Sequence, residues 1–486
     1  MNEGTLPTSW QQASLGEVLN AIVGGGTPPK SKPEYFQGDI PLMTVKDMRQ
    51  RRPTATGFNI TREGLESSSA KLIPADTIVI ATRMGLGKVV RAPFEMAINQ
   101  DLKALFPSAG INESYLELWL LSIAEKLESM GTGTTVKGLR LEKLKGLEFP
   151  VAPSNEQNRI VEKIETLFAQ IDKGEEALRE VQKLLKRYRQ SILKAAVTGE
   201  LTRDWRQANQ HKLEPASDLL ARILETRREN WQGRGMYKKP AAPDTDELPD
   251  LPSGWTWATL PMLGELGRGK SKHRPRNDPR LYENGTYPFL QTGRVRNSSG
   301  RISQYDKLYN DFGLSQSRLW PAGTVCITIA ANIAESGILE IDACFPDSVV
   351  GFIPHEDIWA EYVETFIRTA KRDLDRYAPA TAQKNINLEI LNNLAVPLPP
   401  TEEQRQICER LHEEFAEIDA LEVTCTASFA RSTALRQSIL KSAFTGQLVP
   451  QNPNDEPASE LLARIRAERE ATPKKKTTRK KSKARI

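Results

Sequence analysis

The chain carries a long internal repeat, and this repeat constrains its fold more than any other feature of the sequence. Residues 7–200 match residues 252–447 of the same chain. The matched positions include Pro41 with Pro288, Pro107 with Pro354, Lys137 with Lys384, Pro150 with Pro397, Arg189–Lys194 with Arg436–Lys441, and Glu214–Ile223 with Glu456–Ile465. The repeat is far longer than a solenoid unit. We therefore expect two similar halves with pseudo-two-fold symmetry, as in a homodimer.

A long helix is predicted in each half, shortly after Pro150 and Pro397. The sequences Ser154-Asn-Glu-Gln157 and Thr401-Glu-Glu-Gln404 have the S/T-x-x-Q pattern of a capping box. Thr198-Gly199 and Thr445-Gly446 supply a glycine stop at the other end. The predicted helices therefore cover residues 155–198 and 402–445, and each is roughly 65 Å long at 1.5 Å per residue.

Apolar residues recur along both helices at alternating spacings of four and three, which is typical of a coiled-coil seam. The seam residues of the first helix are Ile160, Ile164, Leu167, Ile171, Leu178, Val181, Leu185, Tyr188 and Ile192, and those of the second are Ile407, Leu411, Ile418, Leu421, Leu435 and Ile439. A helix of this length cannot bury its seam inside a small domain. We therefore expect the two helices to pair as an antiparallel coiled coil. The alternative is that each seam belongs to the core of its own half.

The rest of each half predicts a β-rich head. Runs of β-branched residues at 76–82 and 323–330 follow turn residues and are too short for helices. One amphipathic helix per head is expected at 114–128 and 360–374, and shorter helices at 217–230 and 459–470. The expected fold is α+β, with a head at 1–150, a helical scaffold at 151–232, a linker at 233–252, a second head at 253–397, a second scaffold at 398–470, and a disordered basic tail at 471–486.

The net charge of +5 says little about the folded part of the chain. Residues 471–486 contain eight of the 67 Lys and Arg and no acidic residue, which leaves 59 basic against 62 acidic residues elsewhere. The tail contributes either solubility or nonspecific contact with phosphates. No signal peptide and no apolar run of membrane-spanning length is present, so we expect a soluble cytoplasmic protein. The four cysteines lack metal or disulfide spacing and are expected to be reduced and semi-buried.

No set of residues in the sequence assembles a catalytic site. The segment Gly264–Ser271 matches the G-x-x-x-x-G-K-[ST] phosphate-binding loop. That loop requires a helix N-terminus directly after it, and Pro275 and Pro279 argue against a helix there. No metalloprotease, serine-hydrolase or amino-methyltransferase motif is present, and the four histidines are scattered. We therefore expect a chain without enzymatic activity, without a cofactor and without a metal, with an NTP-binding enzyme as the alternative.

Positive charge gathers in loops of both heads, among glycine, proline and small polar residues. The candidate DNA-binding residues of the first head are Lys30, Lys32, Lys46, Arg49, Arg51, Arg52, Arg83, Lys88, Arg91 and Lys137. Those of the second head are Arg268, Lys270, Lys272, Arg274, Arg276, Gln291, Thr292, Arg294, Arg296, Arg301, Gln383 and Lys384. Lysine and arginine position a protein on phosphates, and arginine, glutamine and asparagine read base edges. This composition predicts two surfaces that contact double-stranded DNA.

Two heads on a stiff helical scaffold can meet two half-sites on one face of B-DNA if these lie about 34–36 Å apart. Because the two heads differ in nearly all their polar residues, the half-sites should also differ. The sequence therefore predicts a two-part, asymmetric target with an unread spacer. The alternative is a coiled-coil adaptor whose heads bind protein and have no DNA specificity.

Each half has the same order of features: a head, a helix that starts with Glu-Gln, the sequence Arg-Gln-Ser-Ile-Leu-Lys, and then Gly-Glu-Leu or Gly-Gln-Leu. This repeated order resembles the specificity (S) subunit of type I restriction-modification systems. The resemblance covers essentially the whole chain. It implies that the heads are target recognition domains and that the long helices form an antiparallel coiled coil. It also implies two modification (M) subunits that use S-adenosylmethionine to methylate adenine at N6, and restriction (R) subunits that use ATP and Mg to translocate and cleave DNA. The chain itself would catalyse nothing.

The resemblance also assigns one segment of each head. Thr134–Leu139 and Thr381–Ile386, which contain Lys137 and Lys384, correspond to the Gly/Thr-rich segment that closes each recognition domain of the family. The first copy has Val-Lys-Gly at 136–138, whereas the second has Gln-Lys-Asn at 383–385. The two segments are therefore not expected to make equivalent contacts, and the resemblance transfers no individual base-reading residue.

Overall fold

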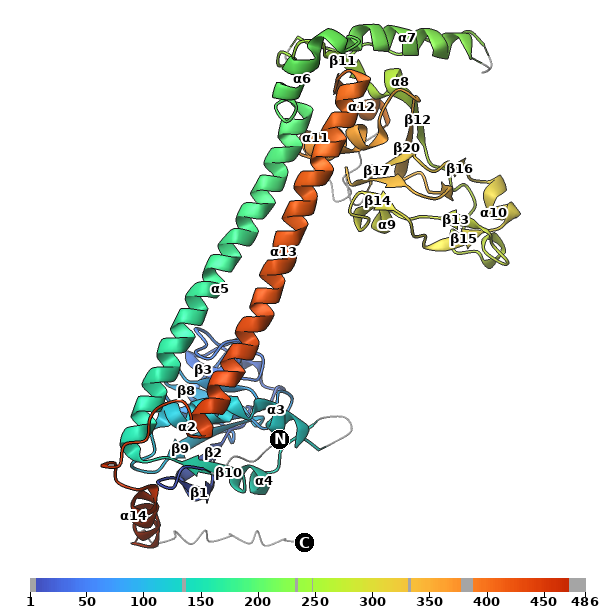
Figure 1. Cartoon of the computed structure of the whole chain (residues 1–486). Coiled ribbons are helices and arrows are strands. Elements are labelled where there is room, and N and C mark those ends of the chain that lie inside the picture. The colour runs from blue at the N-terminus through green and yellow to red at the C-terminus, as the bar shows by residue number, and fades with distance from the viewer. Residues whose placement is uncertain are drawn as a thin grey trace, which may run out of the picture. The chain divides into compact units, whose positions relative to one another are not determined.

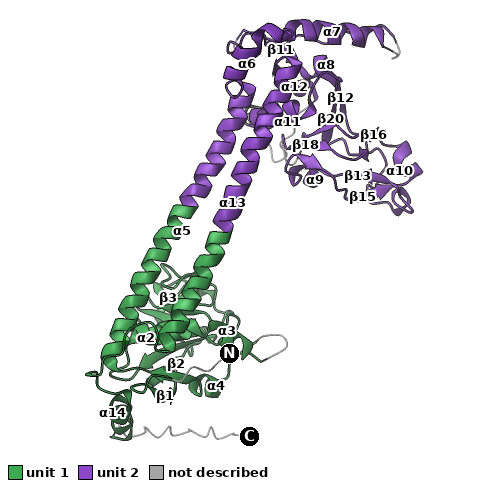
Figure 2. Cartoon of the chain, viewed as in Figure 1, with its two compact units in different colours: residues 1–178, 427–486 green, residues 179–426 purple. Residues whose placement is uncertain are grey.

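The structure is a computed structural model that describes residues 6–132, 137–231, 235–246, 248–330, 334–376 and 388–471. It divides into two compact units, residues 1–178 with 427–486, and residues 179–426 (Figure 2). Each unit holds one β-rich head and a part of both long helices. The helical part of each unit therefore comes from both halves of the chain.

Two helices of 44 residues each, α5 (Ser154–Val197) and α13 (Thr401–Phe444), follow the two heads in the sequence (Figure 1). Their bounds agree with the predicted ranges to within one residue. Each is followed by a glycine in the left-handed region, Gly199 at φ +73° and Gly446 at φ +75°. A side chain is strained in this conformation, so these glycines end the helices as the sequence predicts.

The capping boxes predicted at the starts of α5 and α13 are wrong. The Ser154 hydroxyl donates to the carbonyl of Gly110 at 3.2 Å, and the Thr401 hydroxyl donates to the carbonyl of Asp357 at 3.3 Å. Both carbonyls lie in the preceding head, more than 40 residues earlier in the sequence. A capping box would instead use the first turn of the helix itself. Tertiary partners have replaced the local ones.

The glutamine of each motif joins the helix start to the main chain of the head. Gln157 Oε1 accepts a hydrogen bond from the Asn112 N–H at 2.8 Å, and its Nε2 donates to a carbonyl five residues earlier at 2.8 Å. Gln404 makes the same two bonds, with the Trp359 N–H at 3.0 Å and a carbonyl five residues earlier at 3.0 Å. Both glutamines are fully buried. Their burial is possible because both ends of the amide are paired.

Within the first unit, the beginning of α5 packs against the end of α13. Ile160 and Ile164 belong to one buried cluster with Ile439, and Arg436 pairs with Asp172 at 2.7 Å. Since low-numbered residues of α5 meet high-numbered residues of α13, the two helices are antiparallel. The residues come from different halves of the chain, so the alternative that each seam serves its own half is wrong.

Within the second unit, the end of α5 packs against the beginning of α13. Ile192 belongs to one buried cluster with Ile407 and Ile418. The Tyr188 hydroxyl donates to Glu414 at 2.9 Å. This unit therefore shows the same antiparallel pairing as the first, and the predicted coiled coil is confirmed.

Four predicted seam residues are substantially exposed to solvent. Val181 is 39% exposed, Tyr188 50%, Leu421 50% and Leu435 49%. An α-helix has 3.6 residues per turn, so a strict seven-residue pattern drifts by about 20° per heptad around a straight helix. Buried seam residues such as Leu185, Ile418 and Ile439 lie close in sequence to these exposed positions, so the buried seam is interrupted along both helices.

The first head contains two four-stranded sheets. One has the order β2-β9-β6-β7 and is antiparallel throughout, with β2 (Leu19–Gly24), β9 (Leu102–Pro107), β6 (Ile78–Ala81) and β7 (Val89–Arg91). The other has the order β4-β3-β8-β5, with β4 (Phe58–Ile60), β3 (Ile40–Met43), β8 (Met96–Ile98) and β5 (Lys71–Ile73), and only β3 and β8 are parallel. A separate pair joins β1 (Gln11–Ser14), at the start of the head, to β10 (Glu148–Val151), which lies directly before α5 in the sequence.

The second head repeats this pairing scheme. The sheet β12-β20-β17-β18-β14 contains β12 (Gly264–Arg268), β20 (Val349–Pro354), β17 (Val325–Thr328), β18 (Ser336–Leu339) and the additional strand β14 (Arg301–Ile302). The sheet β15-β13-β19-β16 contains β15 (Lys307–Tyr309), β13 (Tyr287–Phe289), β19 (Ala343–Cys344) and β16 (Leu319–Trp320). The pair β11 (Thr256–Thr259) with β21 (Ala395–Leu398) corresponds to β1 with β10. The internal repeat and the α+β fold are thus confirmed.

Helices complete the two heads and the scaffold. The helix expected at 114–128 is two helices, α2 (Glu113–Ser122) and α3 (Ala124–Ser129), whereas the one expected at 360–374 is the single α11 (Ala360–Arg376). The predicted short helices are α7 (Ala216–Glu229) and α14 (Ala458–Ala471). The other helical segments are η1 (Pro33–Phe36), α1 (Arg62–Glu66), α4 (Leu141–Lys145), α6 (Arg203–Asn209), η2 (Gln210–Lys212), α8 (Leu260–Leu263), η3 (Pro279–Leu281), α9 (Thr292–Arg296), α10 (Asp311–Ser315) and α12 (Leu388–Asn392).

The four cysteines are buried free thiols, as expected from their spacing. Burial raises the pKa of the Cys344 thiol to about 11 and that of the Cys408 thiol to about 12. Both thiols are therefore protonated at neutral pH and unreactive in the folded protein. Among the described residues, none of the helices combines the length and apolar character needed to cross a lipid bilayer.

Candidate nucleic-acid interface

The phosphate-loop sequence Gly264–Ser271 does not form a phosphate-binding loop. Its first five residues are strand β12, which pairs with β20. A Cβ atom on Gly264 would lie 2.2 Å from the carbonyl oxygen of Ile353, so this glycine allows close strand approach. No α-helix follows until α9 at Thr292. Without a helix N-terminus there is no cradle of amides for a phosphate, so the alternative of an NTP-binding enzyme acting through this segment is wrong.

Four arginines in the basic region of the second head are paired with carboxylates. Arg276 lies 2.7 Å from Asp347, Arg280 lies 2.8 Å from Asp278, and Arg294 lies 3.1 Å from Asp306, while Arg301 pairs with Glu361. Arg280 and His273 hold the pKa of the Asp278 carboxyl well below its usual range by hydrogen bonding to it. These arginines are therefore partly neutralised within the protein, and their side chains order the surrounding loops.

The cations at residues 268–274 have no carboxylate partner in the described part of the second head. Arg268 donates to the carbonyl of Asp347 at 2.6 Å, and Arg274 donates to the carbonyls of Ser271 and His273 at 2.6 and 2.9 Å. Lys270 and Lys272 are exposed. A backbone carbonyl orients a guanidinium without cancelling its charge, so this segment presents net positive charge to solvent.

The predicted residues Thr292, Arg294 and Arg296 form part of the short helix α9 (Thr292–Arg296), and Gln291 directly precedes it. Gln291 precedes the helix with its side chain exposed, and its N–H donates to Asp306 at 2.8 Å. Thr292 begins the helix, and Arg296 ends it with an exposed side chain. Gln291 and Arg296 are therefore exposed at the two ends of this short helix, and Asp306 fixes its start.

Two arginines of the first head are structural, which corrects their assignment to the DNA surface. Arg91 is only 4% exposed, and its guanidinium lies 2.9 Å from Glu117 and 3.0 Å from Glu113. Arg51 also pairs with Glu117, which is fully buried, and its other nitrogen lies 3.6 Å from Glu165 of α5. A buried carboxylate requires such partners. Arg91 is therefore unavailable to DNA, and Arg51 is largely committed to Glu117.

The other first-head candidates lie at the surface with varied partners. Arg52 pairs with Asp76 at 3.1 Å on the surface. Lys32 donates to the Tyr35 hydroxyl at 2.9 Å and lies 4.8 Å from the centre of that ring. The candidates Lys30, Lys46 and Arg49 are exposed and have no carboxylate partner in the described part of this head. Lys46 and Arg49 share a turn that Asp47 fixes by accepting hydrogen bonds from the backbone N–H groups of Thr44 and Gly57.

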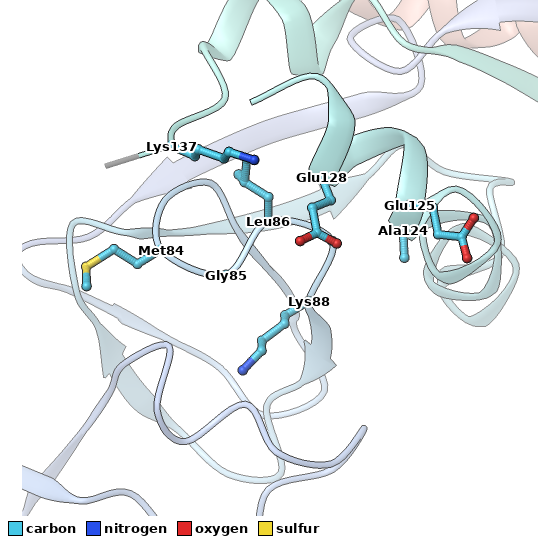
Figure 3. Close-up of a pocket in the computed structure, with 9 residues that line it drawn as sticks. Met84, Gly85, Leu86, Lys88, Ala124, Glu125, Glu128 and Lys137 are labelled. Atoms are coloured by element: carbon cyan, nitrogen blue, oxygen red, sulfur yellow. The ribbon is translucent and has the colours of Figure 1, made fainter. Parts of the chain in front are cut away.

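Two further cations line a hollow of about 520 Å³ in the first head (Figure 3). Lys88 and Lys137 line this hollow together with Glu125 and Glu128 of helix α3. Arg83, next to Met84 in the sequence, forms a β-bridge with Gly138, and its guanidinium lies 3.7 Å from Asp101. This β-bridge brings the loop after β6 next to the segment that the resemblance assigns to the end of the recognition domain.

The structural role of Glu117 was not predicted, although one feature of the sequence pointed to it. Position 117 lies on the apolar face of a predicted helix, and a carboxylate there needs a cation from elsewhere in the fold.

Gln383 and Lys384 lie outside the described residues, as do Thr134–Val136 and the basic tail from residue 472.

Comparison with known protein families identifies two matching regions in the chain. The family described as type I restriction modification DNA specificity domain matches residues 7–183 and 252–424. The two matches begin at the start of each repeat and include each head and most of the long helix that follows it. Each family match therefore coincides with one copy of the internal repeat.

Curated relatives match along almost the whole chain. The type I restriction enzyme EcoKI specificity subunit of Escherichia coli K12 is 26% identical and covers 99% of this chain and 100% of its own length. The StySPI specificity subunit of Salmonella potsdam is also 26% identical with the same coverage, and the EcoDI specificity subunit of Escherichia coli is 27% identical. These relatives are specificity subunits and not catalytic subunits, and the chain is likewise a non-catalytic component.

Two solved structures share the fold. One, from a study of complex assembly and conformational transition of the type I R-M system, has a TM-score of 0.65 at 18% identity and covers 91% of this chain and 100% of its own. The HsdS subunit of Thermoanaerobacter tengcongensis has a TM-score of 0.54 at 18% identity, with coverage of 92% and 99%. These likenesses show the fold, and the family match over both repeats shows that the chain belongs to the family of specificity subunits of type I restriction-modification systems.

Proposed function

We propose that this chain reads a two-part, asymmetric DNA sequence, with the head at 1–150 recognising one half-site and the head at 253–397 the other. The observation that carries this proposal is that the two heads share one strand-pairing scheme and differ in their exposed charged residues. Two heads with the same fold are expected to dock on DNA in the same way, whereas different side chains at the DNA surface would recognise different bases. The antiparallel helices of the segments 151–232 and 398–470 would keep the half-sites at a fixed spacing, with unread base pairs between them.

In this proposal, the exposed cations place each head on the phosphates. In the second head these are Lys270, Lys272 and Arg274, with Gln291 and Arg296 as candidate readers of base edges. In the first head they are Lys30, Lys46, Arg49, Lys88 and Lys137. The paired arginines, such as Arg276, would contribute less because an acidic neighbour already compensates their charge.

The chemistry would belong to partner subunits. We infer that two M subunits bind S-adenosylmethionine and methylate adenine at N6 within the target, and that R subunits use ATP and Mg to cleave DNA in which the target is unmethylated. This chain would supply no catalytic group and would decide only where its partners act. Its family membership supports this division of labour, and the cytoplasm, where chromosomal DNA lies in a bacterium, is the proposed site of action.

The test is to sequence methyladenine in the genome of a host that expresses this chain with its partner subunits. The expected result is one asymmetric motif in two parts with an unspecified spacer of constant length. A chimera in which residues 10–150 come from a relative should change one half-site and leave the other. Absence of any motif would favour the adaptor alternative, and a change in both half-sites would refute independent reading by the two heads.

A further inference from the structure

The turn between β6 and β7 in the first head presents an apolar side chain in an unusual backbone conformation. Met84 is 69% exposed and has φ +59°. The other non-glycine residues with positive φ in the described part of the chain are Asp76, Asn284, Ser299 and Ala334, which are small or can bond to their own backbone. Met84 alone among these five combines a long apolar side chain with a strained backbone. Such strain persists only where the surrounding structure fixes it.

Contacts on both sides hold this turn in place. The Met84 N–H donates to the carbonyl of Lys137 at 3.4 Å, and the Lys88 N–H closes the turn on the carbonyl of Gly85 at 3.1 Å. A Cβ atom on Gly85 would lie 2.5 Å from a methyl group of Val45, and a Cβ atom on Gly87 would lie 2.6 Å from a carbonyl oxygen of helix α3. The turn is therefore packed against two neighbouring elements, and Met84 is presented from a rigid position.

The side chains around Met84 carry charges of both signs. Arg83, which precedes Met84, is exposed and lies 3.7 Å from Asp101. Lys88 ends the turn, and Lys137 lies on the adjacent segment; both line the same hollow as Glu125 and Glu128 (Figure 3). Figure 3 shows the Met84 and Lys88 side chains leaving the turn on the side away from Ala124 and Glu125 of helix α3. An apolar group between cations suits a DNA groove, where phosphates line both edges and base edges lie between them.

The corresponding turn of the second head has a different character. By the spacing of the repeat, Arg83 corresponds to Ala330 and Lys88 to Glu335. Glu335 pairs with Lys371 of α11 at 2.6 Å, and Ala334, the counterpart of Gly87, also has a positive φ of 55°. The second head thus has a residue with positive φ at the position of Gly87, but it lacks the cations that the first head has at positions 83 and 88. The basic turn with an exposed methionine is a feature of the first head.

We propose that Met84 contacts the bases of the half-site read by the first head and contributes to its sequence preference. This inference rests on the proposed function of the chain as a DNA reader. Lys88 and Lys137 would hold the phosphates while the thioether side chain meets base edges, where an apolar group discriminates thymine through its C5 methyl group. The rigid turn would lower the entropy lost when the side chain is ordered on DNA.

The test uses the full chain in complex with its M subunits and the target duplex found by methyladenine sequencing. Affinity is measured for that duplex and for duplexes with single base-pair changes in each half-site. M84A should weaken discrimination at one or two positions of the first half-site by roughly tenfold, the size of a single mismatch, and should leave the second half-site unchanged. M84L, which keeps the apolar volume, should retain most of the discrimination.

Met236 provides a matched control, since it is 93% exposed and lies outside both heads. M236A should leave discrimination at all positions unchanged. The idea is refuted if M84A retains full discrimination, if it weakens all duplexes equally, or if it only reduces assembly with the M subunits. Equal melting temperatures of M84A and the wild-type chain must accompany any loss. A wild-type complex without a two-part target would instead refute the proposed function itself.

Discussion

The buried carboxylate of Glu117 should make Arg91 important for stability and unimportant for DNA contact. Glu117 is fully buried and is held by Arg91 at 2.9 Å and by Arg51. Removing one partner of a buried ion pair costs about 3–5 kcal/mol, because the remaining charge loses its compensation. Since Arg51 would remain, we expect R91A to destabilise the first head by about 3 kcal/mol, which raises its unfolded population roughly 150-fold.

Hydrogen exchange measures this effect locally, through the amides of β6 and β7 on which Arg91 lies. R52A is the control, because its pair with Asp76 is exposed on both sides and should contribute at most about 1 kcal/mol. Equal effects of R91A and R52A on exchange would refute the assignment of a buried clamp. A loss of DNA affinity in R91A with unchanged exchange would return Arg91 to the DNA surface.

Three further predictions concern other regions. Burial raises the folded-state pKa of Glu156, so the stability of the first unit should decline as pH rises through that pKa, and E156Q should flatten this dependence in urea unfolding measured between pH 4 and 8. The double variant K270A/K272A should reduce the slope of log affinity against log salt by about 2, whereas R276A, whose charge is paired with a carboxylate, should change it by less than about 1; equal slopes would contradict the proposed phosphate contacts. The Cys326 thiol is fully buried with a raised pKa and should resist thiol reagents until denaturant is added, so rapid labelling of the native chain at this residue would contradict the fold.

The sequence predicted the helical scaffold well because the signals for it are local. The glycines at 199 and 446 end the long helices within one residue of the expected positions, since a left-handed residue is a property of the backbone itself. The pairing also followed from the repeat, because a long apolar seam needs a partner of equal length. A two-fold relation between the two halves makes such a pair antiparallel. The prediction of burial was wrong at single seam positions such as Val181 and Tyr188, because the exposure of each side chain depends on how far its helix rotates along the pair.

The candidate site was harder to predict because charge in a sequence does not show its partners. Arg91 and Lys88 both lie close to the same glycines in the sequence, yet one is buried against Glu117 and the other is exposed. Gly264 belongs to a phosphate-loop pattern but lies in a strand, because its pairing with β20 depends on residues almost 90 positions away. In each case, a tertiary contact decides what the local pattern cannot.

The buried glutamines at the helix starts bear on how such a chain can change in evolution. Gln157 and Gln404 bind the adjoining head only through main-chain N–H and carbonyl groups, which every non-proline residue possesses. These bonds therefore do not depend on which side chains the head carries at Asn112 and Trp359. An exchange of one head for another would keep them, whereas side-chain contacts such as that of Asn112 with Asn158 would have to be matched by the incoming head.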